Sequence, residues 1–232
     1  MCFSASASFA LSGVLLGVGV KSLTQSPSRR HVMFASIPLV FAAQQATEGV
    51  VWRTIDGGAH ATVHRLAVVA FLGFALIVWP MWVPFSLQLI ERSPARQKVL
   101  TRLVWFGVAA AVAAVVLLTR SQPVAVVAGH SIRYNRAGNA TGWLKALVLL
   151  AYVAPMILPL FVSTAPLARA IGVALAMSLV LTALVERTAL TSVWCFFAAI
   201  LSGLILVAIT RSDFSRPILA HPGWRPPIPE ES

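Results

Sequence analysis

The sequence is poor in charged residues, and acidic residues are scarcest. Only 11% of its 232 residues are charged, with seven Asp and Glu against 18 Lys and Arg. Soluble domains carry about a quarter charged residues. This scarcity, together with 58% hydrophobic residues and a mean hydropathy of +0.84, excludes an ordinary soluble protein. Two cysteines are too few for a disulfide framework. The composition therefore predicts an integral membrane protein.

Fingerprints of several function classes are also absent. The sequence has no Walker, dinucleotide-binding or kinase motif and no GxSxG elbow. The last apolar run holds no lysine for retinal, and no run holds two histidines for bis-imidazole haem ligation. The net charge of +11 is spread over short loops, so we expect membrane lipids and no nucleic acid as partners. No basic stretch precedes the first apolar run, so we expect no cleavable signal peptide.

Long apolar runs make up most of the chain, and seven of them are long enough to cross a bilayer as helices. The expected fold class is an all-α membrane protein, a seven-transmembrane-helix bundle in one domain at 1–210. The proline-rich segment 211–232 is expected to be a poorly ordered cytoplasmic tail. The predicted spans are 3–20, 32–52, 66–89, 103–118, 143–162, 168–185 and 191–209.

Small residues and prolines predict local features of these spans. Serines at positions 4, 8 and 12 and the pair Gly13 and Gly17 predict a face of the first span that packs closely on a neighbouring helix. Pro80 and Pro84 predict a kink in the third span. The apolar and then alternating pattern at 124–135 predicts a short hairpin.

The basic residues predict the orientation. Eleven of the 18 lysines and arginines lie on the side of the first, third and fifth loops and the tail, and seven lie on the other side. Cytoplasmic loops carry the excess of basic residues. We therefore expect the N-terminus outside and the C-terminus in the cytoplasm, in a multi-pass protein of the cell inner membrane.

The predicted span 32–52 is unusual because its apolar run contains amides and a carboxylate. Gln44, Gln45 and Glu48 share one helical face, and Trp52 lies one turn beyond Glu48. A carboxylate within a span usually faces the protein interior or a water-filled cavity. The predicted topology puts this face at the outer mouth of the bundle. The candidate outer-face polar site comprises Gln44, Gln45, Glu48, Trp52, His130 and Glu186.

Two other groupings on the same side are candidates for chemistry. His60 and His64 are four residues apart, which places two imidazoles on one helical face, and Cys2 is a further candidate metal ligand. The alternative is that both histidines are interfacial loop residues. Cys2 and Cys195 are a candidate disulfide or thiol pair. They are otherwise two buried small apolar residues. A divalent metal is thus the candidate cofactor, and its identity stays open.

These residues leave three functions open. The first is a binding, sensing or transport-type protein in which the Glu48 site takes a cation, a proton or a lipid headgroup. The second is a membrane-embedded metal-dependent hydrolase or thiol-redox enzyme. The third is a structural subunit in which Glu48 only ties helices together, paired for example with Arg53, Arg120 or Arg187. Polar residues near the membrane midplane are sparse, which argues against a through-channel or a classical transporter. Homo-oligomer formation stays open.

Four stretches together resemble a family of bacterial multi-pass membrane proteins of unknown function. The resemblance implies a polytopic protein of the bacterial inner membrane and no assigned activity. The topology alone is similar to alkaline-ceramidase-like hydrolases, but their three histidines with Ser and Asp inside spans are not matched. The four stretches are Met1-Cys2-Phe3-Ser4-Ala5, Gln44-Gln45 with Glu48-Gly49 and Trp52, Trp79-Pro80 with Trp82-Val83-Pro84, and Ser192-Val193-Trp194-Cys195-Phe196-Phe197-Ala198-Ala199.

Overall fold

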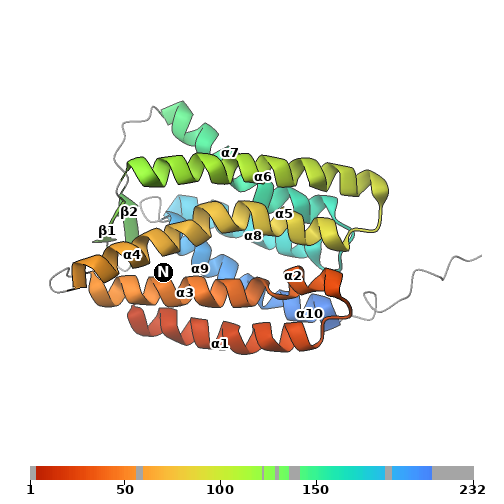
Figure 1. Cartoon of the computed structure of the whole chain (residues 1–232), viewed down its shortest axis with the longest axis horizontal. Coiled ribbons are helices and arrows are strands. Elements are labelled where there is room, and N and C mark those ends of the chain that lie inside the picture. Colours follow the sequence, from red (N-terminus) through yellow and green to blue (C-terminus); the bar gives the residue numbers. More distant parts are fainter. Residues whose placement is uncertain are drawn as a thin grey trace, which may run out of the picture.

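The computed structural model describes residues 4–55, 60–121, 123–128, 131–135, 142–185 and 190–210. Most of these residues are helical, and the long helices lie roughly side by side in a bundle (Figure 1). The elements are α1 (Ala5–Thr24), the 3-10 turn η1 (Arg29–His31), α2 (Val32–Ala35), α3 (Ile37–Thr54), α4 (Ala61–Gly73), the π-helical segment η3 (Phe74–Val78), α5 (Trp79–Ile90), α6 (Pro94–Arg120), β1 (Val124–Ala128), β2 (Ser131–Asn135), α7 (Gly142–Val162), α8 (Ala168–Val185), α9 (Leu190–Ser202) and α10 (Leu204–Thr210).

Four helical stretches within the described residues are long and apolar enough to span a membrane. Large apolar side chains are exposed on them, as expected where lipid is the neighbour; Trp105 on α6, for example, is 68% exposed. The chain is therefore a mostly helical protein of membrane-spanning character, and the seven predicted spans remain a prediction. The four stretches are Ala5–Thr24, Ala61–Ile90, Pro94–Arg120 and Thr191–Thr210.

The predicted span 32–52 differs most from the structure, because it is divided into α2 and α3. Ser36 separates the two helices, and Pro38 follows in the first turn of α3. Proline is favoured there because its missing N–H would have no helical acceptor. α3 is not among the four stretches that qualify as spans. Its amides and carboxylate lower its hydropathy, and half of its residues are buried among other helices.

A π-helical segment, Phe74–Val78, precedes Pro80, and the predicted kink stays a prediction. The Trp79 N–H bonds to the Phe74 carbonyl, five residues back. The Ala75 carbonyl therefore loses its α-helical donor, and its π-helical donor would be Pro80, which has no N–H. The Tyr152 hydroxyl of α7 donates to this carbonyl at 2.8 Å. The sequence of the segment thus creates an acceptor that a neighbouring helix uses.

α1 and α3 pack antiparallel, and the serine face of α1 is the contact surface. The Ser12 hydroxyl donates to the Ala42 carbonyl at 2.8 Å, and Ser8 is buried one turn earlier. The predicted role of Gly13 and Gly17 is wrong within this chain, because a Cβ at either position would meet nothing within 4 Å. Gly19 makes the close approach instead, against Leu39.

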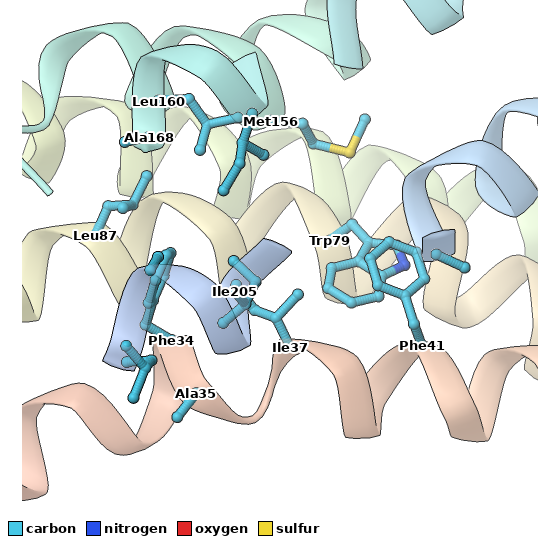
Figure 2. Close-up of a cluster of buried hydrophobic side chains, with 14 of the residues drawn as sticks. Phe34, Ala35, Ile37, Phe41, Trp79, Leu87, Met156, Leu160, Ala168 and Ile205 are labelled. Carbon is cyan, nitrogen blue, oxygen red and sulfur yellow. The ribbon is translucent and has the colours of Figure 1, made fainter. Parts of the chain in front are cut away.

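A large apolar cluster joins every helix from α1 to α10 except α4 (Figure 2). Within this cluster the rings of Phe41 and Trp79 stack with centroids 3.9 Å apart. Aromatic pairs of this kind bury large areas and fix the relative position of the elements that carry them. This contact holds α3 against α5 and so sets the position of the polar residues that follow Phe41 on α3.

The predicted hairpin is confirmed. β1 and β2 pair antiparallel, with Val127 opposite Ile132. The hairpin lies at one end of the bundle, whereas α2 and the α5–α6 turn lie at the other (Figure 1). Ile132 is completely buried, and Tyr134 stacks on Phe71 of α4 at 4.9 Å between centroids. The hairpin therefore closes one end of the bundle, called here the hairpin end.

Candidate functional site

Four polar side chains are completely buried near the hairpin end. Gln44, Gln45 and Glu48 of α3 and Ser192 of α9 all have 0% exposure, and together they are called the Glu48 cluster. The side chains are enclosed in the bundle in this structure. The expected opening of this face at the outer mouth of the bundle stays a prediction.

Two short hydrogen bonds fix the cluster to other helices. The Ser192 hydroxyl donates to Glu48 Oε1 at 2.6 Å, although the two residues are 144 positions apart in sequence. The Trp79 indole N–H donates to Gln44 Oε1, also at 2.6 Å. Spacing places Gln44 and Glu48 on one face of α3, and these bonds show that the face meets α5 and α9.

Gln45 differs from its neighbours because neither its amide oxygen nor its amide nitrogen has a hydrogen-bond partner. The Ser8 hydroxyl of α1 is likewise buried without a partner. Ser8 and Gln45 each lie about one turn from the Ser12–Ala42 contact on facing helices. Buried amides in folded proteins are nearly always satisfied, by water or an ion where protein groups are lacking. The cluster therefore has polar capacity that the described protein atoms leave unused.

An apolar cavity of about 70 Å³ lies next to the cluster. Trp79 and Cys195 line it, and Cys195 is a free, buried thiol that interacts with Gln44 and Glu48. An engineered apolar cavity of about 150 Å³ binds benzene, and this one is about half that size, so it suits no lipid-sized ligand without side-chain movement. Its other lining residues are Phe34, Ile37, Phe41, Val83, Tyr152, Met156, Leu160, Ile171, Leu175, Trp194, Ala198, Leu201 and Ile205.

Among the described residues, the structure shows neither the predicted metal site nor a disulfide. The described part of the chain holds no group of three His, Cys, Asp or Glu side chains that would bind a metal. His64 Nδ1 instead lies 3.1 Å from the Thr54 hydroxyl, and His60 is exposed. The thiol of Cys195 forms no disulfide in this structure. Three of the predicted residues lie outside the described residues: Cys2, His130 and Glu186.

Trp52 is half-buried. Trp79 provides the indole N–H that Gln44 accepts, and its distance from α3 in the sequence gave no indication of this contact. Ser192 was also missed as a site residue, although it belongs to one of the four stretches that carry the family resemblance. A serine two residues before a tryptophan at the start of an apolar run is too common a pattern to identify a carboxylate partner.

A Trp79→Phe substitution tests the contact between α5 and the cluster. The ring can still stack on Phe41, but the buried Gln44 oxygen loses its donor. We expect the free energy of unfolding to fall by about 1–2 kcal/mol, measured by denaturation in mixed detergent micelles. Trp105→Phe, at an exposed position on α6, is the matched control and should change little. Equal effects of the two substitutions would contradict the proposed contact.

Sequence reasoning also missed a second buried carboxylate, Glu91, at the opposite end of the bundle. Its side chain is 6% exposed and accepts hydrogen bonds from the Arg92 and Ser93 N–H groups and from the Thr164 N–H and hydroxyl, at 2.7–3.0 Å. Burial raises the pKa of Glu91, but these four bonds together lower it more, so its pKa lies below the ordinary value. Glu91 thus joins the α5–α6 turn to the α7–α8 loop.

Comparison with known proteins identifies a family and no function. A family of unknown function, DUF6629, matches residues 1–219. No curated protein sequence and no solved structure matches the chain. The functional argument therefore rests on the residues and their geometry.

Proposed function

This chain belongs to the family of unknown function DUF6629, and we propose from its geometry that it is a membrane protein that binds or senses a proton or a monovalent cation through the Glu48 cluster. The observation that carries the proposal is the complete burial of the Glu48 carboxyl group together with its hydrogen bond from Ser192. An ionised carboxylate in an apolar interior is costly unless its charge is neutralised. Uptake of a proton or a cation provides that neutralisation.

The chemistry of the donors favours a small monovalent species. Glu48 and Gln45 offer oxygen atoms, which suit hard cations, and Gln45 has no protein partner for its amide oxygen. Divalent cations such as calcium usually take six to eight oxygen ligands, several of them carboxylates. The described residues place one carboxylate in the cluster, so the ligand set supports a proton or a monovalent cation over a divalent metal.

The burial of the cluster argues against the lipid-headgroup hypothesis at this position. Each of its four side chains has 0% exposure, and the adjoining cavity is too small for a headgroup. A proton or a bare cation can reach such a site through transient opening near the hairpin. From the sequence we also propose that the protein lies in the bacterial inner membrane with its N-terminus outside.

The test compares Glu48→Gln with the wild type in nonionic detergent. The substitution keeps an oxygen that accepts from Ser192 but removes the group that binds a proton or cation. We expect the unfolding temperature of the wild type to depend on pH or on replacement of choline by sodium or potassium at constant ionic strength. A saturating ligand at a hundredfold excess over its Kd stabilises by about 2.7 kcal/mol. The variant should lose the cation dependence and the part of the pH dependence that comes from Glu48, and it should keep the acid response that Glu91 gives.

Ser86→Ala is the matched control, since it removes a buried serine whose hydroxyl bonds only within α5, to the Val83 carbonyl. It should keep the full pH or cation response. If Glu48→Gln folds and retains the wild-type response, the proposal is rejected. The tie between α3 and α9 would then be the role of Glu48, as expected for a structural subunit.

A further inference from the structure

A second cavity lies at the end of the bundle opposite the hairpin. α6 begins beside the Glu91 turn and ends near β1, and its 27 residues extend about 40 Å. The cavity, of about 360 Å³, lies near the beginning of α6, where the α7–α8 loop meets it. A water molecule takes about 30 Å³, so the cavity has room for a hydrated polyatomic ion. Its lining residues are Arg96, Ser163, Thr164, Ala165, Leu167, Arg169 and Ala170.

Two guanidinium groups from different helices face this cavity. Arg96 of α6 donates one hydrogen bond to the Val162 carbonyl at 3.2 Å, which holds its side chain at the cavity wall. Arg169 of α8 is exposed and makes no hydrogen bond or ion pair with the described residues. Planar guanidinium groups present paired N–H donors that match the oxygens of phosphate.

The positive charge of Arg169 is unfavourable at its position near the N-terminus of α8. Arg169 occupies the first turn of α8, which holds no acidic residue. A cation there opposes the helix dipole, which favours negative charge at this end. The backbone N–H groups of Arg169 and Ala170 also have no acceptor among the described residues. A bound anion would satisfy these donors and remove the conflict.

The nearby carboxylate does not cancel this positive charge. Glu91 does not line the cavity, and its two oxygens already accept four hydrogen bonds. Those bonds also use both hydrogen-bond donors of Thr164. Thr164 therefore lines the cavity but donates no hydrogen bond to a ligand.

From this cavity and its two arginines, we propose a binding site for a phosphate-type oxyanion, held by the guanidinium groups of Arg96 and Arg169 at the first turn of α8. The anion is carried either by the headgroup of an anionic phospholipid or by a free phosphate. The predicted topology supports the lipid source, because this end faces the cytoplasm, where anionic headgroups attract basic residues. The site is separate from the Glu48 cluster and does not depend on its function.

The experiment measures unfolding temperature in nonionic detergent during titration with dioctanoyl phosphatidylglycerol or sodium phosphate. Dioctanoyl phosphatidylcholine and sodium chloride at equal ionic strength are the reference ligands. We expect stabilisation by at least one of the two anionic probes and an affinity about tenfold weaker in Arg169→Gln, because one charge-assisted contact is lost. Arg169→Lys should recover part of the affinity.

Lys98→Gln is the matched control, since it removes an equal charge from an exposed residue of α6 outside the cavity. Its affinity should equal that of the wild type. Stabilisation by phosphatidylglycerol alone identifies a lipid headgroup, and stabilisation by sodium phosphate identifies a free anion. The proposal is overturned if neither anion stabilises the protein, if phosphatidylcholine acts equally, or if Arg169→Gln binds like the wild type.

Discussion

The Glu91→Ala variant is expected to lose about 3 kcal/mol of unfolding free energy. The substitution removes the acceptor of four hydrogen bonds and leaves buried N–H donors of the two loops without partners. Each buried donor left unsatisfied costs about 1–3 kcal/mol, and some of these donors can turn to water. Denaturation in mixed detergent micelles measures the loss. A loss below about 1 kcal/mol would mean that the contact does not hold the loops together.

The Glu91→Gln variant separates the shape of this residue from its charge. The amide keeps one acceptor oxygen and should lose less stability than the alanine variant. Because the folded protein lowers the pKa of Glu91, the ionised form contributes stability above the pKa of the unfolded chain. That contribution is lost as the pH falls through the lower pKa of the folded state. The stability difference between wild type and Glu91→Gln should therefore shrink in acid, and a difference that grows instead would contradict this assignment.

The second large effect is expected at Gly107, where α6 approaches α5. A Cβ at this position would collide with the Pro80 carbonyl oxygen. That carbonyl lacks the usual α-helical donor, because the residue four positions later is Pro84. The colliding atom belongs to the backbone and cannot move aside by a change of rotamer. We expect Gly107→Ala to destabilise the protein by about 2–3 kcal/mol, within the usual range for overpacking.

Gly13→Ala is the matched control for this prediction. Gly13 is also in the middle of a long apolar helix, but a Cβ there meets nothing within 4 Å. Alanine is favoured over glycine inside helices by up to about 1 kcal/mol, so this variant should be neutral or more stable. Thermal unfolding of both variants in the same detergent gives the comparison. If the two substitutions have the same sign and size, α5 and α6 do not pack as described.

The fold was predictable to the extent that hydropathy controls it. The segment 168–185 coincides with α8, and the alternating pattern at 124–135 became a hairpin, because both depend on neighbouring residues. The segment 32–52 was predicted as one helix but is divided at Ser36. An apolar run alone does not show that its helix changes direction to fit its neighbours.

The candidate site was predictable on one helix only. The spacing of Gln44, Gln45 and Glu48 placed them on one face, and that face is buried. Their partners Trp79 and Ser192 lie 35 and 144 residues away from Gln44 and Glu48, respectively. No local pattern encodes such pairs, because they depend on how α3, α5 and α9 pack.

The sequence by itself determined that this protein has membrane-spanning character and that α3 carries an unusual polar face. Both conclusions follow from composition and helical periodicity, which are local properties of the chain. Only the tertiary structure decided that Glu48 is enclosed and that Glu91 joins two loops. It also brought Arg96 and Arg169 to one cavity. These outcomes depend on contacts between distant segments, and burial and charge pairing arise only when those segments meet.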